Sequence, residues 1–280
     1  MARSVVERKD RFFAANRSVV EYEIKPAHTI TFLADVDLTQ VEALRRAAGE
    51  NKPSYTSFVV KAGALLLKEM PYCNRRVCRL PQFLFLVKGL QRFTHSDVAV
   101  AAERDAPGNE YAMFADVIRD ADEKSLTEIN TWLRALAASD ENSNAQWRIY
   151  SNLIRRLPHW FSTPLIRMPV FIPSLWEKYR GAALMVSSPA KYGVDCVMTV
   201  WTSPMGISFG YVKDRPRVRD GQVVACPSMM VTMNFDRRVM TGAPGARVFK
   251  RLVDLLENAQ TELTDGGRRD AAGAAPPAAA

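Results

Sequence analysis

The sequence predicts an α+β fold in which helices cover a large mixed β-sheet. Segments with a β pattern follow one another in runs, and long helical patterns separate these runs instead of alternating with single strands. A hydrophobic content of 48% with 24% charged residues is typical of a globular domain. We expect residues 1–264 to form that domain, and residues 265–280, rich in Gly, Ala and Pro, to be a disordered tail.

The first half of the sequence predicts two helices that lie between strands. Residues 28–36 (HTITFLADV) are typical of a strand, and Asp37 can cap a helix that stops at Gly49. Ser54 opens a second helix whose nearly continuous apolar residues indicate burial on most sides. Further β patterns follow at residues 83–93, 96–103 and 111–118.

A third helix is predicted over residues 123–138, because leucine and isoleucine recur there at steps of three and four. Residues 153–180 come next and carry four prolines among aromatic and basic side chains. Four prolines forbid one long helix, and the polar residues interrupt the segment too often for a membrane span. We expect this to be the least regular part of the chain.

The last hundred residues are predicted to be mainly β, ending in an amphipathic helix over residues 245–259. One face of that helix carries Val248, Leu252, Leu255 and Leu256. The predicted strands lie at residues 183–188, 194–201, 206–212, 220–224 and 229–235.

Charge and motif content exclude several classes of function. The net charge of +8 is spread along the chain, which suits an anionic ligand, but no basic stripe with aromatics predicts nucleic-acid binding. Four cysteines without a CxxC pair, and three histidines without metal-ligand spacing, predict neither zinc nor disulfides. The charged N-terminus lacks the pattern of an export signal, so we expect a cytoplasmic protein.

Five segments, in order, carry a resemblance to a known family. They are PSYTSFVVKAGALLLKEMPYCN, SDVAVA, FADVIRDADEKSLTEI, VSSPAKYGVD and NFDRRVMTGAPGARVFKRLVDLLENAQ. The chain resembles the catalytic domain of dihydrolipoamide acyltransferases of 2-oxoacid dehydrogenase complexes, which has the chloramphenicol-acetyltransferase-like fold. The resemblance implies a trimer with a channel at each subunit interface, and acyl transfer between coenzyme A and dihydrolipoamide.

The family's active-site motif is altered in this sequence. The family uses Asp-His-Arg-x-x-Asp/Asn-Gly, whose histidine removes the thiol proton, and a serine of the neighbouring subunit that stabilises the oxyanion. Here Arg237 stands in place of the histidine and Thr241 in place of Asp or Asn, while Ser187 matches the serine. Arginine has no neutral population to accept a proton at physiological pH. The resemblance thus implies Ser187, Arg237 and Thr241 as site residues.

Each of these assignments has an alternative. Arg237 either attracts an anionic group or favours a thiolate, or it marks the decay of an unused site. Ser187 either holds the oxyanion or serves only as a hydrogen-bonding element of the strand end. Residues 153–180 either cover the core and a trimer contact, or form a lid over the channel or a surface for a membrane or partner. His28, His95 and His159 are the other histidines that could act as a base.

Two functions follow from these alternatives. The first is acyl transfer from an acyl thioester such as acyl-CoA, impaired or repurposed by Arg237. The second is an inactive homologue that acts as an assembly or partner-binding subunit. The sequence shows no lipoyl attachment domain, so a lipoyl- or acyl-carrier group would come from a partner chain. We expect a homotrimer or a higher oligomer.

Overall fold

The computed structural model describes residues 28–78, 89–102 and 114–264. The predicted tail at 265–280 lies outside the described residues, as do parts of the strands predicted at 83–93 and 111–118. Among the described helices, none is long and apolar enough to cross a membrane.

A seven-stranded mixed sheet forms the centre of the molecule. The order is β1 (Thr29–Asp37), β9 (Gln222–Asp236), β7 (Met205–Phe209), β6 (Leu184–Ser187), β4 (Val98–Ala102) and β5 (Phe114–Ile118), with β8 (Lys213–Arg219) also paired to β9. β6 runs parallel to β4 and β7, and the other pairs are antiparallel. β2 (Arg75–Cys78) and β3 (Gly89–Arg92) form a separate hairpin. The predicted α+β class is confirmed.

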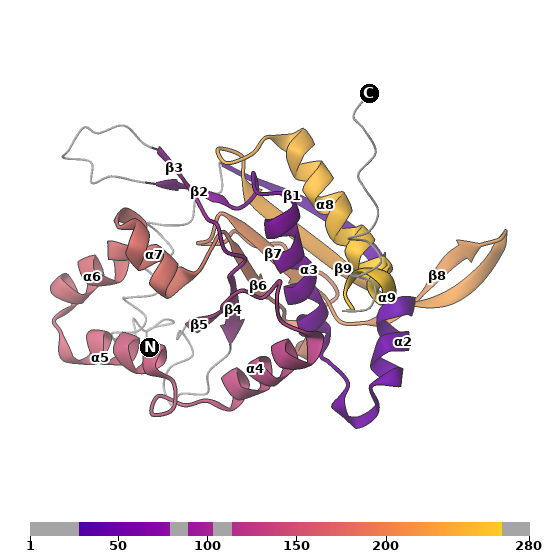
Figure 1. Cartoon of the computed structure of the whole chain (residues 1–280), viewed down its shortest axis with the longest axis horizontal. Coiled ribbons are helices and arrows are strands. Elements are labelled where there is room, and N and C mark those ends of the chain that lie inside the picture. Colours follow the sequence, from indigo (N-terminus) through magenta and orange to yellow (C-terminus); the bar gives the residue numbers. More distant parts are fainter. Residues whose placement is uncertain (1–27, 79–88, 103–113, 265–280) are drawn as a thin grey trace, which may run out of the picture.

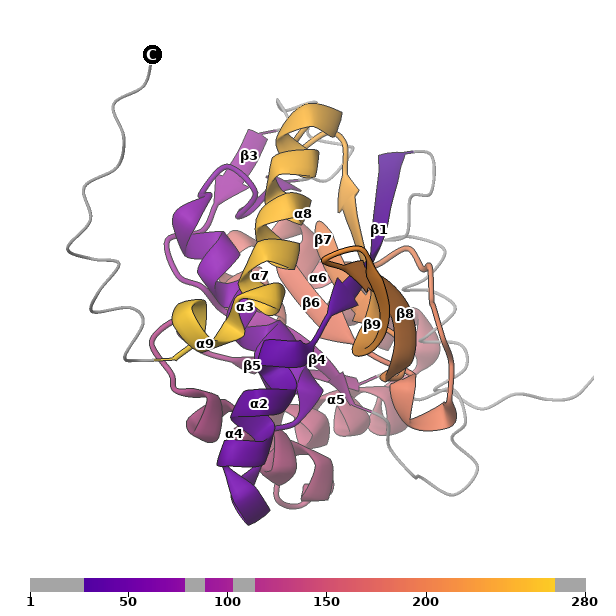
Figure 2. The same cartoon turned by 90° about the vertical axis from the view of Figure 1, so that its right-hand side faces the viewer.

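Helices cover one face of this sheet (Figures 1 and 2). They are α2 (Thr39–Ala47), α3 (Tyr55–Glu69), α4 (Leu126–Ala138), α8 (Gly242–Glu257) and α9 (Ala259–Glu262). α3 packs on β4 and β6, while α8 packs on β1. The predicted apolar face of the last helix is confirmed, because Val248, Leu252, Leu255 and Leu256 are all fully buried.

The helix boundaries follow local sequence signals. Ser54 caps α3 by accepting a hydrogen bond from the Ser57 amide, as predicted. α4 begins with a capping box between Ser125 and Glu128, so it starts three residues later than the predicted helix. Gly49 has a φ of +58°, which a residue with a side chain adopts less readily, and α2 ends before it.

The segment predicted to be least regular is helical, which corrects the prediction. It contains the end of α5 (Ala145–Arg156) and all of α6 (His159–Phe171) and α7 (Pro173–Arg180), beside the β5 edge of the sheet (Figure 1). Three short helices respect the limit set by the prolines. Pro164 and Pro169 lie inside α6, and Pro173 starts α7, where its missing amide hydrogen costs nothing.

Residues 194–200 do not form the predicted strand. They lie against the sheet face that the helices leave open, where the Thr232 hydroxyl donates to the Val197 carbonyl at 2.8 Å. Two glycines of the sheet make room for them. A Cβ on Gly210 would lie 1.9 Å from the Asp195 carbonyl oxygen, and one on Gly206 would lie 1.8 Å from the Trp201 ring. Side chains of the sheet donate hydrogen bonds to this segment. Its composition is typical of a strand, but it forms no strand among the described residues.

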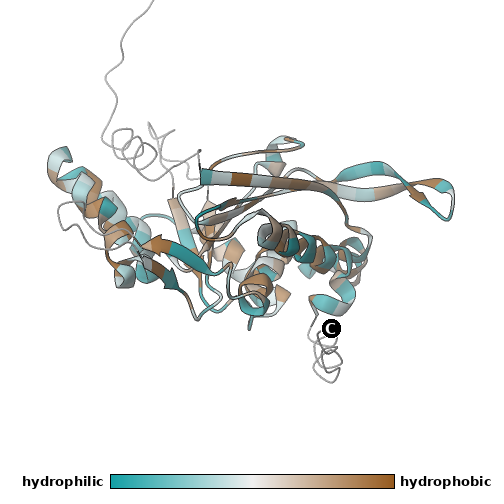
Figure 3. Cartoon of the chain, turned by 90° about the horizontal axis from the view of Figure 1, so that it is seen from above, coloured by the Kyte–Doolittle hydropathy of each residue, from teal (hydrophilic) through white to brown (hydrophobic). Residues whose placement is uncertain are grey.

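The β8–β9 hairpin also departs from the prediction, which placed a strand at 220–224 and none at β8. Asp220 and Gly221 form its two-residue turn, with φ of +50° and +77°. This is the Asp-Gly sequence that such hairpins prefer. The hairpin projects from the sheet (Figure 1), and teal residues are frequent along it while brown ones gather in the sheet (Figure 3).

Candidate active site

Arg237 lies in a turn immediately after β9. Its amide donates to the His28 carbonyl at 2.8 Å, which fixes the backbone of the turn against the start of β1. Asp236 and Arg238 form a fork, with the Arg238 Nε 2.9 Å from Asp236 Oδ1 and the Arg238 Nη2 2.5 Å from Oδ2. This pairing raises the pKa of Arg238. The backbone of the motif is therefore firmly held, while the Arg237 side chain is exposed.

Thr241 occupies the N-cap position of α8. Its backbone is extended and its side chain is exposed, but the hydroxyl makes no capping hydrogen bond. The side chain is therefore not committed to holding the helix. Arg237 and Thr241 thus flank one turn at one end of the sheet.

Ser187 is the last residue of β6 and lies half-buried on the wall of a large cavity of about 1490 Å³. Its hydroxyl has no hydrogen-bond partner among the described residues. The next residue behaves differently, since the Ser188 hydroxyl donates to the Phe209 carbonyl at 2.6 Å and accepts from the Ala190 amide at 3.0 Å. The structural role that the sequence left open for Ser187 is filled by Ser188.

Ser187 and Arg237 do not meet within one chain. Ser187 pairs with Ser208 of β7, and Ser208 pairs with Thr232 of β9. Arg237 lies five residues beyond Thr232, which corresponds to roughly 16 Å along the strand, with two strand spacings to add. The structure brings Arg237 and Thr241 together and leaves Ser187 at the other end of the sheet.

Two further polar groups beside Ser187 were missed by the sequence analysis. Ser208 is 1% exposed and lines the same cavity, and its Oγ has no partner in the described structure. The Trp201 ring covers Gly206 and also lines the cavity, and its Nε1 is buried with no partner among residues 28–78, 89–102 and 114–264. The available signal was a serine inside the otherwise apolar strand GISFG.

The three histidines lie apart from one another. His28 sits at the start of β1, beside Arg237. His95 pairs with Asp120 at 3.3 Å in a largely exposed position, and His159 contacts the Thr163 hydroxyl at 3.1 Å on α6. No cluster of His, Cys, Asp or Glu among the described residues could hold a metal ion. Burial raises the pKa of the Cys73 thiol to about 12, so that cysteine is unsuited to act as a nucleophile.

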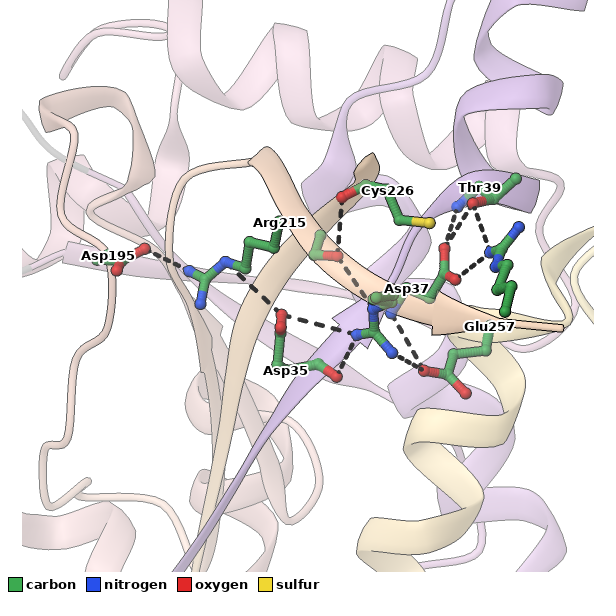
Figure 4. A network of polar contacts seen from close by, with 10 residues as sticks. Asp35, Asp37, Thr39, Asp195, Arg215, Cys226 and Glu257 are labelled. Carbon is green, nitrogen blue, oxygen red and sulfur yellow. Dashed lines mark hydrogen bonds and ion pairs between the residues drawn. The ribbon is translucent and has the colours of Figure 1, made fainter. Parts of the chain in front are cut away.

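A second group of charged residues has a structural role (Figure 4). Arg215 lies 2.5 Å from Asp195, and Arg217 donates to the Asp35 carbonyl at 2.6 Å and lies 3.8 Å from Glu257. These contacts join β8 to β1, to α8 and to the segment after β6. Each of these carboxylates has a cationic partner, so the network fixes the base of the projecting hairpin and offers no free base.

The architecture defines the class of the protein as a chloramphenicol-acetyltransferase-like domain. A solved chloramphenicol acetyltransferase is similar with a TM-score of 0.51 and 11% identity, over 90% of this chain and 99% of that chain. The family model for the 2-oxoacid dehydrogenases acyltransferase catalytic domain matches residues 19–148 and 176–264. The chain therefore belongs to the 2-oxoacid dehydrogenase acyltransferase family, as the sequence resemblance indicated.

Similar proteins include acetyltransferase components of dehydrogenase complexes. The dihydrolipoyllysine-residue acetyltransferase component of the pyruvate dehydrogenase complex of Staphylococcus aureus is 24% identical over 277 residues. That alignment covers 93% of this chain and 54% of the relative, so the chain spans about half the relative's length. The dihydrolipoamide acetyltransferase of Azotobacter vinelandii, solved to study a serine, a histidine and an asparagine in its catalytic mechanism, has a TM-score of 0.66 and 20% identity. The structural match covers 94% of the Azotobacter vinelandii chain and 93% of this chain.

The family model leaves residues 149–175 unmatched. This gap lies almost entirely within the segment 153–180 that the sequence set apart. It contains most of α5, all of α6 and the start of α7, whose side chains form part of the wall of the cavity beside Ser187. A segment that the family model does not match therefore lines the same cavity as Ser187, the predicted oxyanion serine.

Proposed function

We propose that this chain transfers an acyl group from an acyl thioester, such as acyl-CoA, to a thiol acceptor. Ser187 stabilises the oxyanion and Arg237 supplies a fixed positive charge. The observation that carries the proposal is the Ser187 hydroxyl, which lies half-buried on a cavity wall with no partner among the described residues. A free hydroxyl beside a cavity can donate to a developing oxyanion.

Residue spacing supports the correspondence with the Azotobacter vinelandii enzyme. The serine and histidine studied in that protein are 52 residues apart, and its asparagine follows the histidine by four. Here Ser187 and Arg237 are 50 residues apart, and Thr241 follows Arg237 by four. We therefore assign Ser187, Arg237 and Thr241 to the three corresponding positions.

The proposed site is assembled between copies of the chain. Ser187 and Arg237 lie at opposite ends of the sheet, yet both side chains reach the surface or an open cavity. A head-to-tail contact can bring one end of a subunit to the other end of its neighbour, and such contacts form a ring when the rotation between neighbours closes. A homotrimer of this kind would place Ser187 of one copy beside Arg237 of the next.

The reaction follows from thioester chemistry. The acceptor thiolate attacks the carbonyl carbon, a C–S bond forms, and the oxyanion accepts the Ser187 hydrogen bond. The oxyanion then collapses, the original C–S bond breaks, and the donor leaves as a thiolate that takes a proton from water. Arg237 cannot remove the acceptor proton, so it acts by favouring the thiolate that a thiol of pKa about 8.5 forms in solution. A lipoyl- or acyl-carrier partner would supply the acceptor.

One observation favours a second candidate, a non-catalytic assembly subunit. General base catalysis contributes about 10²–10⁴-fold, and a guanidinium at position 237 cannot provide it. A chain that lost this factor could keep the fold and the intersubunit contact without useful turnover.

Acyl-CoA turnover with a dithiol acceptor separates the two candidates. If the chain is an acyltransferase, the native protein should turn over acyl-CoA, and the Ser187→Ala variant should do so about 10²–10³-fold more slowly. Ser188→Ala is the matched control, because it removes the neighbouring hydroxyl and tests for misfolding. Turnover seen only in an Arg237→His/Thr241→Asp double variant would identify an inactive site. No turnover in either protein would refute the acyltransferase proposal.

A further inference from the structure

We propose that the cavity beside Ser187 binds the acyl chain of the donor, and that it takes an acyl group much larger than acetyl. This inference rests on the proposed function, because it names the substrate class of the same site. The cavity has a volume of about 1490 Å³, whereas the three heavy atoms of an acetyl group need only roughly 90 Å³, counted as water-sized volumes. The cavity is also larger than the usual pocket for a drug-sized ligand.

One part of the cavity wall is apolar and comes from the segment outside the family pattern. α5 and α6 contribute six apolar side chains to it, of which Ile166 is buried and the other five are half-buried or exposed. The side chains are Ile149, Tyr150, Leu153, Leu165, Ile166 and Met168. An apolar chain buried against this wall would be stabilised by removal from water.

The part of the cavity wall around β6 and β7, called the floor here, carries polar groups that have no partner among the described residues. Ser208 pairs with Ser187 in register, so the two hydroxyls stand side by side on one face of adjacent strands. The Ser208 Oγ and the Trp201 Nε1 are buried and have no hydrogen-bond partner in the part of the chain that the structure describes. Buried polar groups are normally satisfied, so these two call for a ligand atom or water. Trp201 can only donate, which suits a carbonyl oxygen.

The two surfaces together define an amphipathic ligand. Its thioester carbonyl lies at the floor formed by Ser187, Ser208 and Trp201, and its apolar tail extends towards α5 and α6. The exposed Lys191 and Arg134 also line the cavity and suit the phosphates of a nucleotide-bearing carrier. The substrate class is therefore an acyl thioester with a medium or long apolar chain.

The test compares acetyl-CoA, octanoyl-CoA and free CoA by calorimetric titration of the full chain. Each buried methylene strengthens binding about 4-fold, so burying three of the additional methylenes gives octanoyl-CoA about a 60-fold advantage over acetyl-CoA. Ile149→Glu places a charge on the apolar wall and should abolish this preference. Ile172→Glu is the matched control, an exposed isoleucine outside the cavity wall, and should leave it unchanged.

A variant of the polar floor separates the contribution of the thioester group to binding from the contribution of the apolar chain. Trp201→Phe keeps a ring over Gly206 and removes the indole N–H. It should weaken both acyl-CoAs equally, by about 2- to 10-fold, and leave the chain-length preference intact.

The outcomes separate this inference from the proposed function. Octanoyl-selective binding without transfer to any thiol would support the cavity and reject the acyltransferase. Transfer from acetyl-CoA with no preference for a longer chain, or a preference that survives Ile149→Glu, would reject the cavity and leave the acyltransferase standing. Failure of every CoA species to bind would reject both.

Discussion

Arg237 projects from a turn whose backbone is tightly fixed by its neighbours. The Asp236–Arg238 fork and the bond to the His28 carbonyl hold its position, so the side chain stands at a defined place on the surface. Identifying this position needed only the order of residues in the motif. Which of Ser187 and Ser188 lacks a side-chain hydrogen bond within the described residues depends on the tertiary structure, because the two serines are adjacent and chemically identical.

The pH dependence of acyl transfer tests the role of Arg237. Without a general base, kcat/KM for the acceptor should rise about tenfold per pH unit and level off only near the pKa of about 8.5 of the free acceptor thiol. The Arg237→His/Thr241→Asp variant should level off near pH 7, where an imidazole becomes neutral. Initial rates between pH 6 and 9.5 provide the measurement. A plateau near pH 7 in the native protein would contradict this role and direct attention to His28.

At the scale of elements, glycines decide how the open face of the sheet is covered. Trp201 lies on Gly206 at the start of β7, and Asp195 lies on Gly210 just after its end. The composition of residues 194–201 predicted a strand, but the segment crosses a face where the Thr232 and Asn234 side chains bind two of its carbonyls. Within the described residues, only Val194 of this segment accepts from a backbone amide, that of Tyr211. Strand propensity describes a fit to a pleated surface and does not specify the partner.

Gly206→Ala should destabilise the protein by about 1–3 kcal/mol, because its Cβ would overlap the Trp201 ring. Gly242→Ala is the control, since a Cβ there meets nothing within 4 Å. Urea unfolding of both variants measures the difference. Equal stability of the two would show that Trp201 does not pack on Gly206.

Asp37 links β1 to α2 and to the β8–β9 hairpin. Burial raises its pKa, but hydrogen bonds from Thr39 and Arg219 outweigh burial, and the pKa is lowered overall. A lowered pKa in the folded state stabilises the protein above the unfolded pKa of about 3.9, and this stabilisation is lost as pH falls through the folded value. The contribution is therefore complete at neutral pH.

Asp37→Ala should reduce the free energy of unfolding by about 1 kcal/mol at pH 7, because the Thr39 amide and hydroxyl lose the carboxylate that accepts their hydrogen bonds. The difference from the native protein should shrink as pH falls below about 4, because protonation removes the charge in both the folded and unfolded native chains. Denaturant unfolding at pH 7 and pH 3 measures it. A difference that is constant with pH would assign the effect to packing alone.

At the scale of the whole molecule, the sheet separates the proposed catalytic groups within each chain. No local change in one copy can bring Ser187 to Arg237, since they lie at opposite ends of a hydrogen-bonded sheet. The proposed activity therefore depends on assembly. Dilution of the protein below the dissociation constant of the oligomer should abolish acyl transfer.

Mixing two inactive variants tests the shared site directly. Ser187→Ala and Arg237→Glu should each lack activity, and co-refolded mixtures should recover about a quarter of native turnover, since each head-to-tail interface draws its two residues from different chains. Light scattering on the same samples should give the mass of a trimer or larger. Absence of recovery in a confirmed mixed oligomer would place the site within one chain.

The sequence by itself determined the fold class, the Ser54 cap of α3 and the positions of Ser187, Arg237 and Thr241 in their motifs. These depend on spacing and local hydrogen bonding, which the order of residues records. Tertiary structure alone decided that residues 149–175 form helices that line the cavity beside Ser187. It also decided that, within the described residues, 194–200 form no strand and the Ser208 Oγ and Trp201 Nε1 have no hydrogen-bond partner. Those facts depend on contacts between segments far apart in the chain, and local composition does not encode them.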